Sequence, residues 1–379
     1  MAILYKVQTG AYKNRAGAIA ASLVVEAGIK KYLKKKGLVE KVSVAVISSG
    51  GWHKVQVGAF SSKANAEKRL ALVKAAGFPK AVVLKTGTQD APEGNHPRIR
   101  IWPIWFFEGN ESLFGDCTAI LEYADDDVTV AHCILIDCAQ GEASGTVIKK
   151  LQKAGVKKID AVVISHAHGD HYGGLTEIAK AFPIEKIYLP DCTELDKYQQ
   201  SYGNALRRQA AKVKDSTFMK AGDSFQVGNV RCDCLYICKA KDLSEHDNHH
   251  FVNNMSMVLR FLLDGKIKYH SAGDLQNEGN RLLLKAISDL RAHILKFQWH
   301  GDRNALLKAL IEAIRPLICV SDYHHEETKG GRQRTRKVAE AVGALVLQNW
   351  LHGDVYIDCK ADTITVTSSK GNVKKVFKV

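Results

Sequence analysis

The chain has 379 residues, of which 46% are hydrophobic and 25% are charged. This is the balance of a globular protein with a large core and room for more than one domain. No apolar run reaches the roughly 18 to 20 residues that a membrane-spanning helix needs. The chain enters a strand pattern at once, without the architecture of a signal peptide. We therefore expect a cytoplasmic protein, associated with the cell wall only after lysis or non-classical release.

The formal net charge of +14 is concentrated at the start of the chain. Residues 1–88 contain 16 Lys and Arg against three acidic residues, whereas the remainder is nearly neutral. Five of these cations lie between Lys30 and Lys36, where they complement the dipole at the end of an expected helix. The basic region suits a surface that faces a polyanion, whether teichoic acid, nucleic acid or membrane phosphate.

Two related segments fill this first region. Residues 6–18 recur at 54–66 with seven of thirteen positions identical. Each copy reads as a strand, a Gly-Ala turn and a helix, and the helices are expected to end at Gly37 and Gly77. The closing strands are expected at residues 42–47 and 80–84. The pattern predicts an α+β domain of split βαβ type, with one sheet and two helices.

The repeat resembles the sporulation-related (SPOR) domain over residues 1–87, because its halves share the Val-Gln-x-Gly-Ala-Phe pattern of that family. The resemblance implies binding to the glycan strands of bacterial peptidoglycan, especially strands that lack stem peptides. Carried over to this chain, the candidate glycan contacts are Gln8, Tyr12, Gln56 and Phe60. The two aromatic rings also fit a simpler role, in which they pack a helix against the sheet.

A linker is expected at residues 88–97. The stretch Thr86–Pro97 is polar, contains Gly and Pro, and has no apolar periodicity. It separates the first domain, residues 1–87, from a second domain over residues 98–379.

The nine cysteines all belong to the second domain. Their number is odd, which is typical of a reducing compartment rather than of a disulfide framework. Cys232 and Cys234 alternate like one face of a strand, and with Cys238 they lack the spacing of a metal-binding pair. We expect buried free thiols.

The second domain contains a dense cluster of metal-ligand side chains. Directly after the apolar, strand-like run 159–164, the chain reads Ser-His-Ala-His-Gly-Asp-His-Tyr-Gly-Gly. A buried strand that ends here delivers its ligands at the carboxyl edge of a sheet. Imidazole nitrogen and carboxylate oxygen suit zinc, manganese or iron. The spacing lets two side chains face each of two ions, as in two-metal hydrolytic centres. The four ligand candidates are His166, His168, Asp170 and His171.

This motif resembles the His-x-His-x-Asp-His signature of the metallo-β-lactamase superfamily, whose fold is an αββα sandwich with the metals at one edge. The surroundings resemble one branch, the hydrolase domain of bacterial DNA-uptake (competence) proteins, in order and spacing over residues 98–379. The matching segments are Gly115–Ile120, Leu135–Cys138, Asn253–Leu259, Ser271–Asp274, Leu295–Gly301 and His352–Tyr356.

The resemblance implies two divalent cations, Zn²⁺ or Mn²⁺. Carried over residue by residue, it assigns His166 and His168 to the first ion, Asp170, His171 and His300 to the second, and Asp274 as the bridge. Asp170 would also take part in catalysis, by orienting the attacking water or carrying its proton.

Residue chemistry supports the bridge independently, because a carboxylate between two cations is favoured where an isolated buried carboxylate would be costly. Two simpler readings stay open. Asp274 also fits a turn residue after Gly273, and His300 also fits an interfacial histidine beside Trp299.

The sequence departs from the superfamily pattern in two places. The superfamily often has a further metal-binding histidine before the bridging aspartate, and here only the loop 244–250 offers one, with His250 as its last residue. The branch tends to have asparagine and serine nearby instead, as at Asn254 and Ser256 of this chain. This leaves the first ion an open coordination position of the kind that catalysis requires. Trp299 stands where relatives often show another histidine, so a proton donor or phosphate contact is left unassigned.

Two more polar residues are ambiguous. Asp137 ends an apolar strand. It can either accept the proton of the second ring nitrogen of a metal-binding histidine, which fixes the tautomer, or cap the loop 141–144. His324 lies where relatives place a histidine near the pocket rim, and it also fits a solvated loop.

Three functions follow. The first is a metal-dependent hydrolase in which a metal-held hydroxide attacks phosphodiester bonds of nucleic acid or nucleotides; the substrate class comes from the resemblance, because this fold hosts many hydrolytic activities. The second is the same enzyme directed to the cell wall by its first domain. The third is a non-enzymatic glycan-binding protein, against which the intact ligand set argues.

Overall fold

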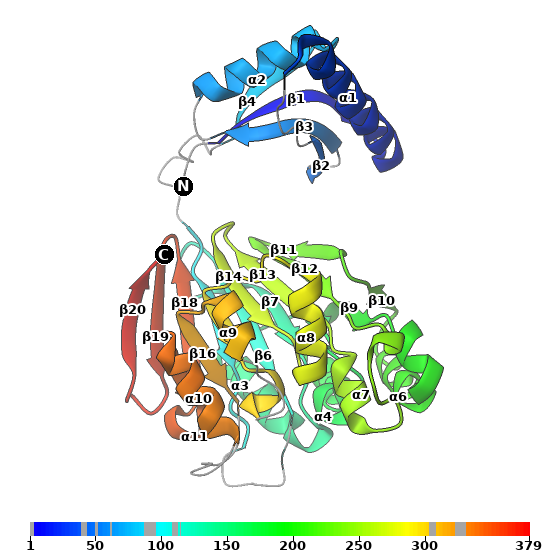
Figure 1. Ribbon diagram of the computed structural model, residues 1–379. Helices are drawn as coiled ribbons and strands as arrows, with labels where there is room; N and C mark the ends of the chain where they lie inside the picture. Colours follow the sequence, from blue (N-terminus) through cyan, green and yellow to red (C-terminus); the bar gives the residue numbers. More distant parts are fainter. Residues whose placement is uncertain are drawn as a thin grey trace. The chain divides into compact units, whose positions relative to one another are not determined.

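The computed structural model describes residues 4–38, 44–49, 52–60, 63–86, 96–107, 113, 115–302, 308–322 and 331–379. It divides into two compact units, Met1–Gly94 and Asn95–Val379, which are described separately (Figure 1). Within the described ranges, no helix combines the length and the apolar character that crossing a membrane requires.

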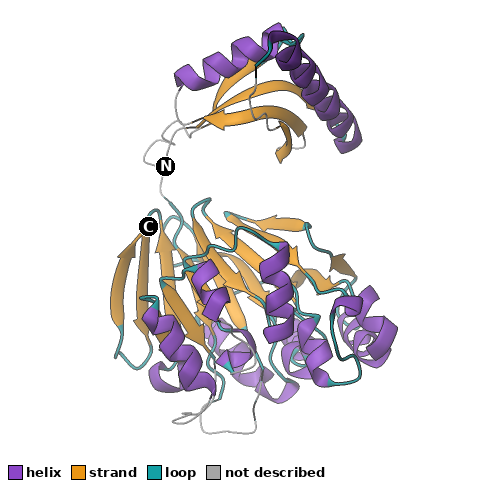
Figure 2. Cartoon of the chain, viewed as in Figure 1, coloured by secondary structure: helices purple, strands orange, loops and turns teal. Residues whose placement is uncertain are grey.

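The first unit is an antiparallel sheet with two helices on one face (Figures 1 and 2). Its strand order is β2-β3-β1-β4. The elements are β1 (Leu4–Tyr12), α1 (Arg15–Lys36), β2 (Val44–Ser49), β3 (Trp52–Phe60), α2 (Lys63–Ala75) and β4 (Val82–Thr86). This is the split βαβ arrangement that the repeat predicts.

Local chemistry sets the ends of these elements. Helix α1 ends where the sequence predicts, because Gly37 adopts a φ of 64° and its N–H bonds back to the last turn. Strand β4 begins two residues later than expected, at Val82. The reason is a turn in which the Ala81 N–H donates to the Phe78 carbonyl at 3.1 Å. Strand β2 begins at Val44, and residues 42 and 43 lie outside the described part.

The candidate glycan contacts lie along β1 and β3. Gln8 and Gln56 are register partners across the two strands. Gln56 is only 6% exposed, whereas Gln8 is half-buried. Tyr12 and Phe60 are partly buried and pack against the core of this unit, so the rings do take part in the packing that the sequence left open.

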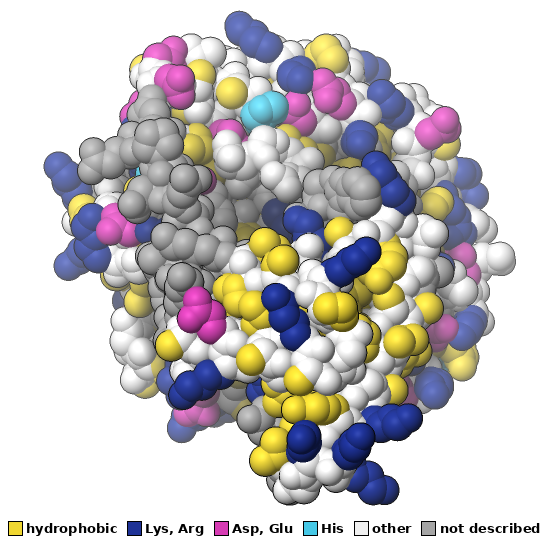
Figure 3. All heavy atoms as spheres, turned by 90° about the horizontal axis from the view of Figure 1, so that it is seen from above, with side chains coloured by type: hydrophobic (Ala, Val, Ile, Leu, Met, Phe, Trp, Pro, Cys, Tyr) yellow, Lys and Arg dark blue, Asp and Glu magenta, His cyan; other side chains and the backbone are white. Residues whose placement is uncertain are grey.

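The outer surface of α1 mixes apolar and basic side chains. Ile19, Leu23 and Val24 are 45%, 63% and 64% exposed, and Lys34–Lys36 end the helix. Figure 3 shows Lys and Arg side chains scattered among exposed hydrophobic ones on the face seen from above.

The second unit is a sandwich of two sheets with helices on both outer faces (Figures 1 and 2). The first sheet has the order β10-β9-β8-β7-β6-β5-β18-β19-β20, and the second has the order β11-β12-β13-β14-β15-β16-β17. This is the αββα fold class expected from the sequence.

The strands of the first sheet are β5 (Ile99–Pro103), β6 (Thr118–Tyr123), β7 (Val130–Ile136), β8 (Ile159–Val163), β9 (Ile184–Pro190), β10 (Ser216–Met219), β18 (Val355–Lys360), β19 (Thr363–Ser368) and β20 (Lys374–Lys378). Those of the second are β11 (Ser224–Val227), β12 (Val230–Tyr236), β13 (Val258–Leu263), β14 (Ile267–Ser271), β15 (Ile294–Lys296), β16 (Ile318–Ser321) and β17 (Leu345–Gln348).

The helices and helical turns of this unit are η1 (Gly141–Ala143), α3 (Ser144–Lys153), α4 (Gly169–Tyr172), α5 (Leu175–Ala181), α6 (Thr193–Ala211), η2 (Ala240–Asp242), α7 (His249–Asn254), α8 (Asn277–Ala286), η3 (Gln298–Gly301), α9 (Lys308–Ile314), α10 (Gly331–Ala341) and α11 (Asn349–His352).

Alternate strand residues face two different cores, as the period of a strand requires. In β8, Val163 belongs to the core between the sheets, whereas Val162 belongs to the core beneath the helices. In β6, Ile120 and Leu121 divide in the same way. The nine cysteines are buried and free, in keeping with the expected thiols.

The parallel strands set the position of the site. Strands β7, β8 and β9 run parallel in one sheet, and β14 to β17 run parallel in the other. Because parallel strands end at the same edge, the loops that follow β7, β8, β14, β15 and β16 are brought to one edge of the sandwich.

Candidate metal centre

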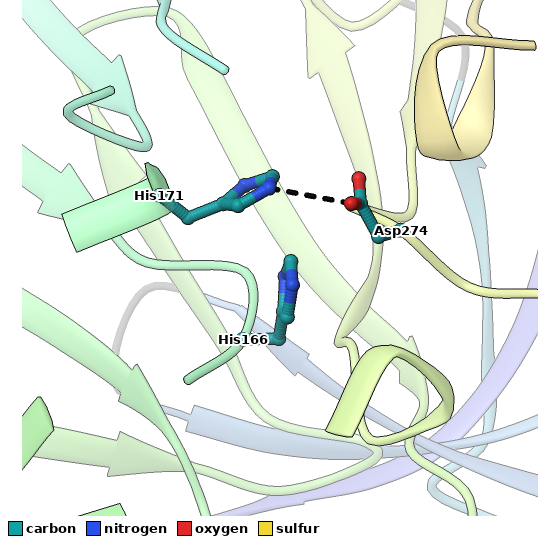
Figure 4. Close-up of side chains that lie close together, drawn as sticks. All are labelled: His166, His171 and Asp274. Atoms are coloured by element: carbon teal, nitrogen blue, oxygen red, sulfur yellow. Dashed lines mark ion pairs between the residues drawn. The ribbon is translucent and has the colours of Figure 1, made fainter. Parts of the chain in front are cut away.

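Three buried side chains meet at this edge. The donor atoms of His166, His171 and Asp274 lie within 4.8 Å of one another (Figure 4). His166 follows β8, His171 belongs to α4, and Asp274 follows β14, so both sheets contribute. The Nε2 atom of His171 is 3.4 Å from Oδ2 of Asp274, the ion pair drawn as a dashed line in Figure 4.

Hydrogen bonds behind the cluster fix the histidine tautomers. Asp137 Oδ2 is 2.9 Å from His171 Nδ1, and a carboxylate can only accept, so Nδ1 carries the proton. The same oxygen accepts from the Ser165 hydroxyl at 2.7 Å. That hydroxyl oxygen therefore accepts from His166 Nδ1, at 3.0 Å. In their neutral forms, the two imidazoles therefore have their lone pair on Nε2.

Two polar atoms of the cluster have no hydrogen-bond partner in the described part of the chain. They are His171 Nε2 and Asp274 Oδ1, and both are buried. An unpaired buried acceptor costs free energy, whereas a divalent cation accepts electron pairs from imidazole nitrogen and carboxylate oxygen together. The residues present fit a divalent metal ion.

The electrostatics of the cluster favour positive charge. Burial opposes a charged His171, but Asp274, Asp170 and Asp137 outweigh it and hold its pKa well above the ordinary value. Burial likewise opposes an ionised Asp274, yet His171 holds the pKa of that carboxyl well below its usual range. The pKa of His166 lies well below its ordinary value because of burial and the neighbouring histidines. A cation between a neutral His166 and an ionised Asp274 suits this field.

The other two motif residues lie at the outer side of the cluster. His168 is half-buried, and its Nδ1 is 3.0 Å from His166 Nε2. Its ring contacts Tyr202 edge-on at 5.4 Å between centroids. Asp170 has 33% of its side chain exposed, with Oδ2 3.8 Å from His171 Nε2. Asp170 is therefore a carboxylate that solvent can reach beside the cluster.

His300 lies in an adjoining group rather than within 4.8 Å of the first three donors. It shares that group with Asp116 and Asp322, which contact its Nδ1 atom at 3.3 and 3.2 Å. Although burial opposes protonation, Asp116, Asp322 and Asp274 raise the pKa of His300 to about 9. Asp116 Oδ2 is also 3.8 Å from Nδ1 of His171, so the two groups are neighbours.

The remaining candidates divide into supporting and peripheral residues. Ser256 Oγ accepts from the Asp274 N–H at 3.2 Å. Asn254 Oδ1 accepts from the N–H groups of Gln276 and Gly279, both at 3.1 Å, and so holds the turn before α8. His250 packs edge-on against Trp299, with 5.7 Å between ring centroids. His324 lies outside the described residues.

Sequence reasoning gave no role to three buried charged residues at this edge: Asp116, Lys296 and Asp322. Each is 2% exposed or less. A signal was present for Lys296, because it is a charged residue in the otherwise apolar run Ile294–Phe297. Asp116 and Asp322 adjoin apolar strands in the same way, but only the fold shows that all three meet.

Of the eight described non-glycine residues with positive φ, four lie in segments that form the site. Asp137, Ala139, Trp299 and His300 have φ values of 58°, 55°, 42° and 54°. Non-glycine residues adopt positive φ rarely, and they do so mostly where surrounding structure enforces it at functional positions. Asp137 and Ala139 lie in the loop after β7, and Trp299 and His300 belong to η3.

Comparison with known proteins agrees with this geometry. Residues 128–229 match the family model of the Metallo-beta-lactamase superfamily, and residues 2–85 match that of the SPOR domain. The chain joins a SPOR domain to a metallo-beta-lactamase domain. The metallo-beta-lactamase fold indicates a metal-dependent hydrolase.

Among the relatives of the metallo-beta-lactamase domain, ComE operon protein 3 of Bacillus subtilis (strain 168) is 23% identical over 185 residues, which cover 47% of this chain and 22% of that protein. Recombination protein 2 of Haemophilus influenzae (strain ATCC 51907 / DSM 11121 / KW20 / Rd) is 21% identical over 174 residues, which cover 46% of this chain and 19% of that protein. The match thus spans about a fifth of each relative. These two proteins bear out the branch resemblance seen in the sequence.

The SPOR domain is similar to a solved structure, the peptidoglycan binding domain of the B. subtilis cell wall lytic enzyme CwlC. The two are 36% identical, with 23% of this chain and 94% of that chain covered and a TM-score of 0.17.

Proposed function

We propose that this chain is a two-metal hydrolase that cleaves phosphodiester bonds in nucleic acid or nucleotides. One observation carries the hydrolytic part. His171 Nε2 forms an ion pair with Asp274 Oδ2, but neither it nor Asp274 Oδ1 has a hydrogen-bond partner in the described part of the chain, and both atoms are buried in one cluster of metal-type donors. An active site of this superfamily needs such donors, whereas most buried polar atoms in proteins are hydrogen-bonded.

His166, His168, Asp170, His171, His300 and Asp274 would hold the ions. Bound divalent ions would polarise a scissile phosphate and lower the pKa of a bound water. The protein's own contribution is positional. Asp137 and Ser165 hold the rings of His171 and His166 with Nε2 toward the centre. Asp170, exposed by 33%, can accept a proton from the attacking water and return it to solvent.

Two features favour a phosphodiester substrate. The sequence resembles the hydrolase domain of DNA-uptake proteins, and one relative bears the name Recombination protein 2, which associates it with nucleic acid. The basic first region, with 16 Lys and Arg among 88 residues, suits a polyanion.

Cleavage of end-labelled single-stranded DNA by the full chain, with Mn²⁺ or Zn²⁺, tests the proposal. We expect metal-dependent cleavage that falls at least 100-fold in Asp170→Ala and His171→Ala. Asp126→Ala is the matched control, because Asp126 lies in an exposed turn after β6. A metal-loaded chain that leaves DNA and nucleotide diesters intact would refute the substrate assignment.

A second candidate is a cell-wall hydrolase, and the SPOR match favours it. The SPOR domain supports peptidoglycan glycan strands as a partner, with Gln8, Tyr12, Gln56 and Phe60 as candidate contacts. Release of soluble fragments from purified peptidoglycan, with intact DNA, would favour this candidate. A chain that binds peptidoglycan but retains no metal would instead indicate a glycan-binding protein without enzymatic activity.

A further inference from the structure

A second group of metal-type ligands lies directly beside the first. Asp116, His300 and Asp322 place donor atoms within 4.8 Å of one another, and each is 8% exposed or less. Asp116 precedes β6, His300 belongs to η3, and Asp322 follows β16. Judged by donor type alone, this group is a candidate for binding a cation of its own.

A lysine already supplies the positive charge in this group. Lys296 ends β15 and is 2% exposed. Its Nζ atom is 2.5 Å from Asp116 Oδ2 and 3.5 Å from Asp322 Oδ2, and it donates to the Phe297 carbonyl at 3.3 Å. A buried ammonium offsets the charge of the two carboxylates. A metal ion bound to the same carboxylates would repel that ammonium at short range in a medium of low dielectric constant.

The other oxygens of the two carboxylates face His300. Asp116 Oδ1 and Asp322 Oδ1 are 3.3 and 3.2 Å from His300 Nδ1. Asp322 Oδ1 accepts a hydrogen bond from His300 Nδ1, so in the neutral ring Nδ1 carries the hydrogen and Nε2 has the lone pair. Metal-binding histidines commonly depend on such a carboxylate for their tautomer and ring orientation.

Asp116 also reaches the first cluster. Its Oδ2 atom is 3.8 Å from His171 Nδ1, and its backbone carbonyl accepts from the Ala139 N–H at 2.8 Å. One buried carboxylate therefore lies behind both His171 and His300, the two histidines assigned to the second ion. Lys296 is the basic residue that compensates it.

We propose that Lys296 is a positioning residue for the second metal ion. Its ammonium holds Asp322 as the acceptor for the Nδ1–H of His300 and Asp116 beside the same atom, and this directs Nε2 of His300 toward the metal centre. The group of Asp116, His300 and Asp322 is thus a support for the centre and not a third metal site. The inference rests on the proposed function, since it takes His300 as a ligand of the second ion.

Zinc titration of the full chain tests the proposal, by calorimetry and by metal analysis after dialysis. The variants are Lys296→Met, which keeps side-chain length without charge, and His300→Ala, which removes the ligand. We expect two Zn²⁺ in the wild type. Lys296→Met should retain the first ion and bind the second 10- to 100-fold more weakly. Lys158→Met is the matched control, because Lys158 lies in a partly exposed ion pair before β8.

Circular dichroism would reveal whether Lys296→Met folds. If it does not, a second variant, Asp322→Asn, tests the same proposal. Asp322→Asn keeps the pair between Lys296 and Asp116. Its amide group must face either Lys296 or the Nδ1–H of His300, so one contact is lost in either orientation. The expected result is again weaker binding of the second ion only, with altered d–d bands when Co²⁺ replaces Zn²⁺.

The outcomes separate the two proposals. If folded Lys296→Met or Asp322→Asn binds both zinc ions with wild-type affinity, the positioning role is wrong and the proposed function stands. A third zinc ion in the wild type, lost on Asp322→Asn, would also overturn it by making the second group a metal site. A wild type that binds neither Zn²⁺ nor Mn²⁺ would refute the metal-dependent function itself.

Discussion

Asp137 Oδ2 lies 2.9 Å from His171 Nδ1, although the two residues are 34 positions apart in the chain. The contact joins the end of β7 to α4, and it is fully buried. The other oxygen, Oδ1, accepts from the Ser165 N–H at 2.7 Å. Both carboxylate oxygens are therefore engaged, and their geometry leaves His171 a single tautomer.

Replacement of Asp137 by Asn should preserve the shape of the side chain and exchange one acceptor oxygen for an NH₂ donor. If Oδ1 of the new residue keeps its bond to the Ser165 N–H, its amide nitrogen faces His171 Nδ1, and two donors then meet. The imidazole must shift or adopt the tautomer that protonates Nε2, so metal affinity should fall 10- to 100-fold. Zinc titration of folded Asp137→Asn measures this. Asp126→Asn, in an exposed turn, should bind zinc as the wild type does, and equal affinities in the two variants would contradict the assignment.

Gly115 shows how closely the backbone packs at this edge. Its φ is +96°, and a Cβ atom at this position would lie 1.7 Å from the Asp170 carbonyl oxygen. Gly115→Ala therefore requires the loop that carries Asp170 and His171 to move, in addition to the cost of positive φ. We expect a loss of about 2 kcal/mol or more in unfolding free energy and at least a 100-fold loss of hydrolysis.

The matched control for Gly115→Ala lies in helix α3. A Cβ atom on Gly145 would meet nothing within 4 Å, and alanine is the better helix former by about 1 kcal/mol. Gly145→Ala should therefore leave hydrolysis unchanged and raise the unfolding free energy slightly. Chemical denaturation and activity are measured on both variants. Wild-type activity in a stable Gly115→Ala chain would show that the loop tolerates displacement.

Asp354 predicts a stability effect that is separate from the metal centre. It is 6% exposed and accepts from Trp102 Nε1 at 2.8 Å, the Trp105 N–H at 3.0 Å and Lys150 Nζ at 2.5 Å. Asp354→Ala leaves three donors without their acceptor, with a cost of about 3 kcal/mol in unfolding free energy. Urea denaturation measures that cost. Zinc stoichiometry should stay at the wild-type value, and its loss would mean that Asp354 also supports the site.

The αββα sandwich and the motif at its edge could be predicted because local pattern and chemistry coincide there. The apolar run before His166 has the length and composition of a buried strand, and its ligands follow directly. The repeat likewise predicted two helices and their glycine ends, since Gly37 terminates α1 through its own backbone conformation. These features depend on residues that are near neighbours in the sequence.

The supports of the site could not be predicted in the same way. Asp116, Lys296 and Asp322 come from three separate segments, and their contacts depend on the register of two sheets. A single charged residue at the end of an apolar strand can be exposed, paired or catalytic, and the sequence does not distinguish these cases. Asn254 is a further example: the sequence places it near the first ion, but only the fold shows that its side-chain oxygen accepts from the backbone N–H groups of Gln276 and Gly279.

His270 predicts a pH dependence of stability. It lies on β14, is fully buried, and neither ring nitrogen has a hydrogen-bond partner in the described part of the chain. Burial, assisted by the charge of Arg260, lowers its pKa to about 4, whereas an unfolded histidine titrates near 6.5. The unfolded state therefore binds the proton more readily as pH falls. The resulting stability is complete above about pH 6.5 and is lost as the pH falls toward 4, by about 3 kcal/mol in all.

His270→Leu removes this titration, so the variant should gain stability relative to the wild type as the solution is acidified. Urea denaturation of both chains at pH 7, 6, 5 and 4.5, with chelator present, gives the difference in unfolding free energy at each pH. Other titrating groups contribute equally to both chains and cancel in that difference. We expect a difference that is constant above about pH 7 and shifts steadily in favour of the variant below pH 6.5. A difference that does not change with pH would mean that His270 is protonated in the folded chain or reaches solvent.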